Sequence, residues 1–310
     1  MIRGSYCRIA GRVCRYEKKG GKLMLKIISA EERLAEKRGH KIVIGGKSGV
    51  GKTSLVRTLD MSKTLFMDLE AGDAAIEGCK VDVIRPRTWQ ECRDFACFLG
   101  GGNPALSEDS PYSMAHYEYV CQTYGDPDTL LSKYDTIFID SITVAGRLCF
   151  SHNQNSPEAR SDRTGKLDTR AVYGAQGREM MAWLTHLQHI REKNVIFVGI
   201  LDEKTDDYGR ITYDLQIEGA KTGRELPGIV DELITMTTLT ADDGSLFRAF
   251  VCDTLNQWGY PAKDRSGRLD AVEEPHLGKL LEKMSGPRPE AMNFVNPKTV
   301  NNKEEENVDA

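Results

Sequence analysis

A glycine-rich motif close to residue 50 limits the folds open to this chain more than any other feature. Residues 41–55 read KIVIGGKSGVGKTSL, in which a short β-branched run precedes a full G-x-x-x-x-G-K-[ST] pattern. Glycine lets the backbone curl so that successive N–H groups point inward at phosphate oxygens, and a helix after the loop adds its positive end. The pattern predicts a strand, a phosphate-binding P-loop and a helix, as in nucleotide-binding proteins.

The residues of this loop have individual expected roles. We expect Lys52 to reach the β- and γ-phosphates and to act in catalysis, and Thr53 to ligate Mg²⁺. The predicted nucleotide-binding residues are Gly46, Lys47, Ser48, Gly49, Val50, Gly51, Lys52, Thr53 and Ser54. The expected cofactors are accordingly ATP and Mg²⁺.

Two further apolar runs end in carboxylates. The run YDTIFIDSIT (134–143) stands later in the chain, where the magnesium-side strand of a P-loop protein is usually found. Asp140 is therefore the expected second ligand of Mg²⁺, and Ser141 is expected to cap the next helix.

The earlier run, TLFMDLEAGD (64–73), follows directly on the P-loop helix and should be the second strand of the sheet. Parallel strands end at the same edge of a sheet as the phosphates. Asp68 and Glu70 share a face, so one of them can orient and polarise the water that attacks the γ-phosphate. The alternative is that Asp68, Glu70 and Asp73 only cap a helix over DAAIEG.

The sequence MDLEAG resembles the strand end of RecA-type ATPases, in which the catalytic Glu follows the strand after the P-loop helix. On this resemblance Glu70 is the general base and Asp68 supports it. The resemblance also implies an α/β fold of the RecA-like P-loop NTPase class, with a mostly parallel central sheet flanked by helices. The runs DELITMTT and LFRAFVCDT, joined by ADDGS, predict an additional C-terminal β-hairpin.

The segment YPAKDRSGRLD (260–270) carries two cations, Lys263 and Arg265, on either side of one Asp. It resembles the K-x-R loop of RecA-fold ring motors, including the DnaB helicases and RadA, which reaches into the ATP site of the next subunit. The resemblance implies that Lys263 and Arg265 are catalytic and that the chain forms a homo-oligomer, a ring or a filament. The alternative is an ordinary solvated turn.

Residues 40–285 as a whole resemble phage-encoded RecA-core ATPases, which are grouped with single-strand annealing proteins of the Sak-four type. This implies ATP hydrolysis in phage DNA recombination or replication, on single-stranded DNA, in the cytoplasm of a bacterial host. RecA relatives bind DNA through two loops, here 151–172 and 203–216. The first loop mixes four cations with three acids and the second is acid-rich, so charge alone does not predict strong DNA binding.

Two other functions remain open. One is a nucleotide-switched loader or assembly factor that does not act on DNA strands. The other is a small-molecule P-loop kinase, which would need an arginine-rich lid and an acceptor pocket, and neither is clear in the sequence. The γ-phosphate sensor is also open: Asp202 and Glu203 follow the strand NVIFVGIL at its usual position, where RecA relatives carry other residues. Residues 100–125 read as an irregular insertion.

The ends of the chain differ in charge from its centre. Residues 1–41 hold twelve Lys and Arg against four Glu, whereas the chain ends in KEEENVDA. We expect a basic arm over 1–39, an ATPase core over 40–285 and a disordered acidic tail over 286–310. KKGGKLM before Met24 is what a ribosome-binding site and start codon would encode, so translation is hypothesised to start at Met1 or Met24.

The remaining composition excludes several classes of protein. Eight cysteines without a CxxC pair predict neither a zinc site nor a disulfide framework, and they fit a reducing cytoplasm. No apolar run is long enough to span a bilayer, so no membrane partner is expected.

Overall fold

The structure is a computed structural model that describes residues 18–19, 22–23, 27–161, 164–205, 207–209 and 211–287. Within the predicted basic arm it contains a small antiparallel hairpin of β1 (Lys18–Lys19) and β2 (Lys22–Leu23), and then α1 (Ala30–Ala35). The predicted acidic tail lies almost wholly outside the described residues, as does Met24. The expected disorder of the tail and the two possible start sites therefore stay predictions.

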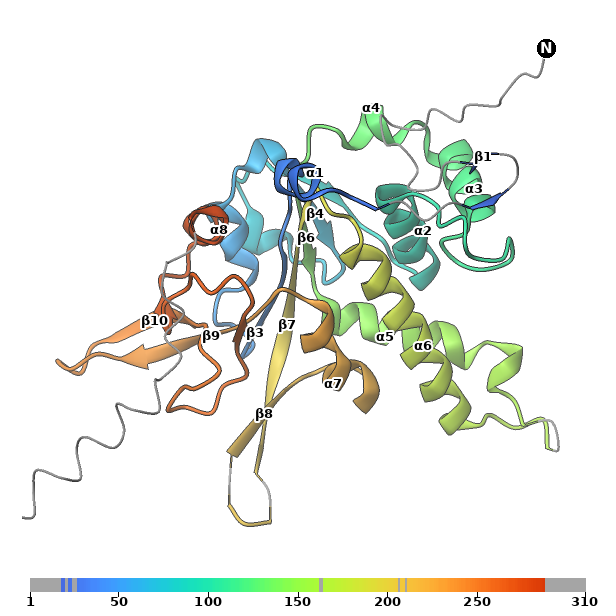
Figure 1. The fold of residues 1–310 in the computed structure, drawn as a ribbon. Helices are drawn as coiled ribbons and strands as arrows, with labels where there is room; N and C mark the ends of the chain where they lie inside the picture. The colour runs from blue at the N-terminus through green and yellow to red at the C-terminus, as the bar shows by residue number, and fades with distance from the viewer. Residues whose placement is uncertain are drawn as a thin grey trace, which may run out of the picture.

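A mostly parallel sheet forms the centre of the protein (Figure 1). Its parallel strands, in spatial order, are β9 (Glu232–Thr240), β3 (Lys41–Gly46), β7 (Asn194–Thr205), β6 (Thr136–Asp140), β4 (Thr64–Asp68) and β5 (Asp82–Ile84). Beyond β9 the sheet continues antiparallel through β10 (Leu246–Val251) and β12 (Val272–Glu273). Two more antiparallel strands are attached, β11 (Lys263–Asp264) to β9 and β8 (Ile211–Leu215) to β7.

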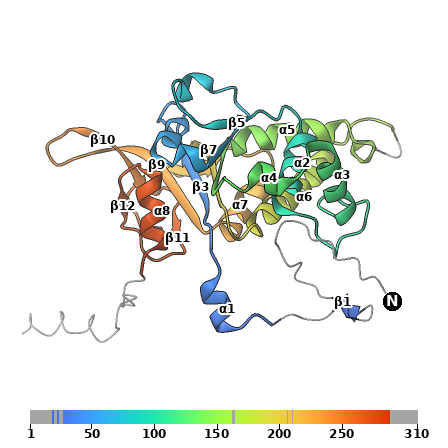
Figure 2. The same cartoon turned by 90° about the horizontal axis from the view of Figure 1, so that it is seen from above.

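Helices cover both faces of this sheet (Figures 1 and 2). One face packs against α2 (Trp89–Gly100), α3 (Met114–Tyr124), α5 (Ile142–Gln154), α6 (Thr169–Gln188) and α7 (Ala220–Ile229). The other face packs against the 3₁₀ helix η1 (Thr53–Thr58) and α8 (Leu277–Ser285). The shorter elements are α4 (Pro127–Leu131), η2 (Met61–Lys63), η3 (Asp73–Ile76) and η4 (Pro157–Ala159).

The central strands are buried on both faces, which explains their continuous apolar sequences. Every residue of β3, β4 and β6 is buried. Phe66 on β4 and Phe138 on β6 stack in the core beneath α8 and η1, with ring centroids 5.5 Å apart. Because a slip of one residue would exchange the two faces of a strand, this packing fixes the register that sets Asp68 opposite Asp140.

The predicted α/β class, with its mostly parallel sheet and C-terminal hairpin, is confirmed by this arrangement. The hairpin consists of β9 and β10, joined at the predicted Asp-Gly turn. None of the helices in the described part of the chain has both the length and the apolar run that crossing a bilayer requires.

Three local expectations were wrong. The segment 100–125 is not wholly irregular, because Ser113 caps α3 by accepting the N–H of His116. Strand β7 does not end at Asp202 and Glu203 but continues to Thr205 and pairs with β8. The second expected DNA-binding loop, 203–216, therefore lies in a β-hairpin over its described residues. The strand β4 is also not next to the P-loop strand, since β7 and β6 lie between them.

Candidate nucleotide site

The P-loop joins β3 to η1 at the edge of the sheet where the parallel strands end, here called the carboxyl edge (bottom of Figure 1). Gly49 and Gly51 have φ values of 79° and 106°, which residues with a side chain rarely adopt. A Cβ on Gly46 would lie 2.6 Å from the carbonyl oxygen of Met236, so no larger residue fits there. The element after the loop is a six-residue 3₁₀ helix, shorter than the predicted helix.

Lys52 folds back across the P-loop. Its Nζ donates to the carbonyl oxygens of Gly46 at 2.8 Å and of Lys47 at 3.0 Å. Burial lowers the pKa of Lys52, and the negative charges of Asp140 and Glu70 oppose that effect. The ammonium group is thus close enough to both carboxylates to balance part of their charge.

Thr53 and Asp140 meet at the carboxyl edge. Thr53 Oγ1 donates to Asp140 Oδ2 at 2.6 Å, and the Asp140 side chain is buried. Burial, together with the charges of Glu70 and Asp68, raises the pKa of Asp140 from its ordinary 3.8 to about 6, against the effects of Thr53 and Lys52. At neutral pH the Asp140 carboxylate is charged, and keeping this buried group ionised costs free energy. A cation bound beside it would remove that cost.

The pair fits a magnesium ion that shares its ligands with a nucleotide. Mg²⁺ prefers oxygen ligands and is often held by one or two protein groups plus substrate phosphates. Among the described residues there is no group of three or more His, Cys, Asp and Glu side chains that could hold a metal ion by themselves, without phosphate ligands. The residues that would hold the ion are Thr53 and Asp140.

Glu70 lies beside Asp140. It follows β4, whose last residue is opposite Asp140 in the register with β6. The Oγ of Ser141, which caps α5, donates to Glu70 Oε1, and the N–H of Leu69 donates to the carbonyl oxygen of Asp140 at 2.7 Å. Glu70 does not cap the following helix, as the alternative proposed, because the N-cap residue of η3 is Gly72.

Asp68 shapes the turn that carries Glu70. Its side chain is buried, and Oδ1 accepts the N–H of Gly72 at 3.1 Å. Its other oxygen, Oδ2, lies 3.5 Å from Nε of Arg85. Ala71 within this turn has a φ of 56°, a conformation that costs a residue with a side chain about 1 kcal/mol. The turn is therefore held by contacts and not by local preference.

Two further charged residues near the P-loop were not assigned a role from the sequence. Glu203 on β7 forms an ion pair of 2.8 Å with Lys47 of the loop, which connects the expected sensor position to the nucleotide site. A Cβ on Gly51 would lie 3.6 Å from Nη1 of Arg248 on β10. Arg248 forms no ion pair with any residue that the structure describes. Only the long-range register of the hairpin brings Arg248 here, so no local sequence signal could have found it.

Lys263 and Arg265 lie away from the P-loop of their own chain. β11 pairs with the first two residues of β9, at the opposite edge of the sheet, here called the amino edge. Lys263 Nζ donates to the carbonyl oxygens of Pro227 at 2.5 Å and Val230 at 2.9 Å. Arg265 pairs with Asp231 at 3.1 Å. Within one chain both cations stabilise the end of α7, and their role in a neighbouring site stays a prediction.

The two expected DNA-binding segments are more ordered than predicted. The first segment, 151–172, contains the end of α5 and the beginning of α6. Between the two helices, an isolated antiparallel β-bridge joins Arg160 and Leu167. The second forms the β7–β8 hairpin, in which Lys204 pairs with Asp214 at 2.9 Å. This pairing uses one of the two cations of the second segment internally; the other, Arg210, lies outside the described residues.

The chain is similar to one protein family over most of its length and, at low identity, to solved structures. The sequence profile of the AAA domain family matches residues 38–266. No curated protein has a significantly similar sequence. A solved ATPase from the type III secretion system of pathogenic bacteria is 16% identical, with a TM-score of 0.35, over 64% of this chain and 52% of that one. The chain thus spans about half the length of that ATPase. The RadB recombinase is 13% identical, with a TM-score of 0.33, over 74% of this chain and 91% of that one.

Replacement of Asp140 by Asn should stabilise the metal-free protein while it removes magnesium-dependent nucleotide binding. The folded-state pKa of about 6 exceeds the ordinary 3.8, so the free energy of unfolding falls as pH rises through this interval. At about 1.4 kcal/mol per pKa unit, D140N should be more stable by up to about 3 kcal/mol at pH 8, and the difference should shrink toward pH 4.

Urea unfolding in EDTA at the two pH values measures this difference. Mg-ATP should raise the unfolding midpoint of the wild type and leave that of D140N unchanged. A wild type that is the more stable protein at pH 8 in EDTA would contradict the electrostatic interpretation of Asp140.

Proposed function

The chain belongs to the AAA domain family, and from this premise we propose that it hydrolyses ATP and acts on single-stranded DNA in phage recombination or replication. The family match and the mostly parallel sheet support a P-loop ATPase of RecA-like fold. Hydrolysis by Glu70, action on DNA and assembly into an oligomer are the parts that need experiments.

The position of Glu70 carries the proposal of hydrolysis. Its carboxylate bonds to Ser141, directly after the magnesium-side Asp140, and its charge acts on both Asp140 and Lys52. Glu70 is exposed and stands within electrostatic reach of both the P-loop lysine and the magnesium-side aspartate. A protein that only binds nucleotide has no need of a third carboxylate in a site that must accept a triphosphate.

The residues divide the chemistry as follows. The loop N–H groups and Lys52 bind the phosphates, and Arg248 adds a second cation beside Gly51. Bound Mg²⁺ supplies charge neutralisation on the β- and γ-phosphates. Glu70 would accept a hydrogen bond from the attacking water and take its proton as the water oxygen bonds to the γ-phosphorus, while the bond from that phosphorus to the bridging oxygen breaks and ADP leaves. Ser141 holds the carboxylate in position for this step.

Glu70→Gln should abolish turnover and preserve ATP binding. General-base catalysis contributes roughly 10²- to 10⁴-fold, so kcat should fall by about that factor while the Kd for ATP changes less than threefold. Glu77→Gln, in the exposed part of the same connection, is the matched control and should keep wild-type turnover. Phosphate release and equilibrium binding of a fluorescent ATP analogue measure the two quantities.

An unchanged kcat in E70Q would favour the nucleotide-switched loader over the ATPase. The kinase alternative predicts consumption of ATP without free phosphate and only with an acceptor, which the same phosphate assay distinguishes.

The proposal of DNA as substrate is supported mainly by the resemblance to phage recombination ATPases. Arg160 and Lys166, between α5 and α6, and Arg170, in the first turn of α6, are exposed and add a modest positive contribution. We expect single-stranded oligothymidylate to raise the rate of ATP hydrolysis several-fold, and duplex DNA of equal length to do so less. Light scattering with a non-hydrolysable ATP analogue should show particles larger than a monomer. An equal rate with and without the oligonucleotide would contradict DNA dependence.

The proposal of a shared site can be tested by mixing two inactive variants. If Arg265 acts in the neighbouring subunit, R265A alone and E70Q alone are both impaired. Their mixture then contains sites with an intact Glu70 next to an intact Arg265 and should regain about a quarter of the activity of the wild type for random assembly. R248A mixed with E70Q is the control: Arg248 and Glu70 serve the same chain's site, so this mixture should regain none. If mixing R265A with E70Q restores no activity, and R265A alone is active but less stable than the wild type, then Arg265 has only a structural role.

A further inference from the structure

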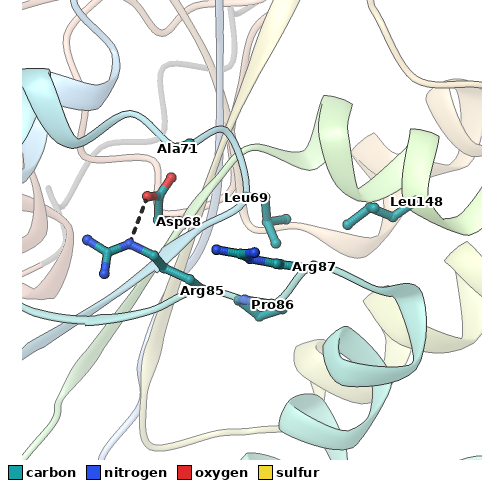
Figure 3. Close-up of a pocket in the computed structure, with 7 residues that line it drawn as sticks. All are labelled: Asp68, Leu69, Ala71, Arg85, Pro86, Arg87 and Leu148. Carbon is teal, nitrogen blue, oxygen red and sulfur yellow. Dashed lines mark ion pairs between the residues drawn. The ribbon is translucent and has the colours of Figure 1, made fainter.

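A pocket of about 250 Å³ (Figure 3) is lined in part by Leu69 and Ala71, the two residues on either side of Glu70. One wall is the turn that carries Glu70, and the others come from the segment after β5 and from α5. The lining residues are Asp68, Leu69, Ala71, Arg85, Pro86, Arg87 and Leu148. Most of its lining residues lie at or after the carboxyl ends of β4 and β5, the two strands farthest from the P-loop strand on that side of the sheet. Nothing in the P-loop chemistry described above uses this pocket.

The pocket combines positive charge with an apolar wall. Arg85, which forms an ion pair with Asp68, and Arg87 both line the pocket. Figure 3 shows Arg87 extended between Leu69 and Pro86, with its guanidinium on the side of Asp68 and Arg85. The Arg87 guanidinium forms no ion pair within the described part of the chain. An unbalanced arginine beside apolar side chains suits a ligand with an anionic group and a flat apolar face.

One buried oxygen in the pocket has an ion pair but no hydrogen bond. Asp68 Oδ2 is fully buried and forms an ion pair with Nε of Arg85 at 3.5 Å, and it accepts no hydrogen bond from the described residues. Buried carboxylate oxygens are nearly always hydrogen-bonded. A ligand with an N–H group, such as the exocyclic amine or ring N–H of a nucleobase, would supply the donor.

The pocket is mechanically connected to Glu70. Leu69 and Ala71 are the residues on either side of Glu70, and Asp68 holds the turn through Gly72. Leu148 lies on α5, whose first turn is capped by Ser141, the residue that bonds Glu70. Any ligand in the pocket therefore contacts both structures that position the Glu70 carboxylate.

We propose that this pocket binds one nucleotide of a single-stranded nucleic acid and that its occupation sets the position of Glu70. Arg87 and Arg85 bind the phosphodiester, as planar guanidinium groups do, and the base packs on Leu69, Pro86 and Leu148. Unstacked bases of single strands are recognised in this way by apolar side chains and arginine planes. The inference rests on the proposed action on DNA and specifies where the strand is sensed.

The geometry favours a nucleotide over an acidic peptide. A glutamate-rich peptide would satisfy the arginine charge, but it would bring no flat apolar face to the wall formed by Leu69, Pro86 and Leu148. A volume of about 250 Å³ is also below the roughly 300 to 1,000 Å³ of pockets that enclose a whole drug-sized ligand, so it suits a single base.

Arg87→Gln tests the pocket, with Arg33→Gln as the matched control. Arg33 is exposed on α1, before β3 and thus toward the amino edge, and its replacement removes the same charge. Anisotropy of fluorescein-labelled oligothymidylate, with a non-hydrolysable ATP analogue at several salt concentrations, measures binding. R87Q should raise the Kd about tenfold, and the slope of log K against log salt should become shallower by about 0.7, the value for one phosphate contact on a single strand.

The coupling to Glu70 has its own readout. The ratio of ATP hydrolysis rates with and without oligothymidylate should fall to near one in R87Q and stay at the wild-type value in R33Q. Arg87→Lys keeps the charge but not the planar guanidinium, and it should recover part of the binding. Loss of DNA binding in R87Q with an unchanged rate ratio at saturating DNA would overturn the coupling.

The outcomes separate this inference from the proposed function. A wild type that neither binds the oligonucleotide nor responds to it overturns both. A wild type that binds and responds, with R87Q indistinguishable from R33Q, overturns the pocket alone. Arg87-dependent binding of polyglutamate in place of the oligonucleotide identifies an acidic peptide as the occupant and also overturns it.

Discussion

The site depends on the gathering of three carboxylates at one edge of the sheet against a single lysine. Burial raises the pKa of Asp140 most, and the negative charges of Glu70 and Asp68 raise it further. Each of the three carboxylates is held by a donor of its own: Gly72 N–H for Asp68, Ser141 for Glu70 and Thr53 for Asp140. These contacts fix the geometry, but they leave an excess of negative charge that a cation bound with a triphosphate would neutralise.

The order of the strands explains how the P-loop reaches these acids. Neighbouring strands lie about 4.8 Å apart, so β3 and β6, with β7 between them, are separated by roughly 10 Å. The loop crosses the end of β7, and Thr53 at its far end contacts Asp140. Glu203, on the extension of β7, meets Lys47 on the way. The strand between the two motifs thus sets the width of the site and supplies one of its charges.

The sequence predicted the parts of the site that depend on local pattern. A continuous apolar run that ends in an acid identifies β4 and β6, and the rule that parallel strands end together brings Glu70 to Asp140 without further information. Arg248 could not be found this way, because it reaches Gly51 only through the pairing of β10 with β9. Arg85 and Arg87 likewise follow a three-residue strand, and only its pairing with β4 brings them to the turn that carries Glu70.

The errors of fold have equally local causes. Helix α3 was missed because the glycine, proline and serine residues before it dominate the segment, although Ser113 supplies an ordinary cap. The β7–β8 hairpin was read as a loop because its residues are acidic, whereas backbone pairing and the Lys204–Asp214 contact stabilise it. In both places polar composition concealed hydrogen bonds that only the folded chain makes visible.

The turn that carries Lys263 and Arg265 constrains how copies of the chain can assemble. Asp264 accepts the N–H groups of Gly267, Arg268 and Leu269, so the turn is rigid. It stands at the amino edge, while the P-loop stands at the carboxyl edge. A two-fold dimer joins one patch to the same patch of its partner, so it cannot set this turn against a P-loop unless both edges enter one interface. Head-to-tail packing sets one edge against the other without that condition, and such packing continues until it closes as a ring or extends as a filament.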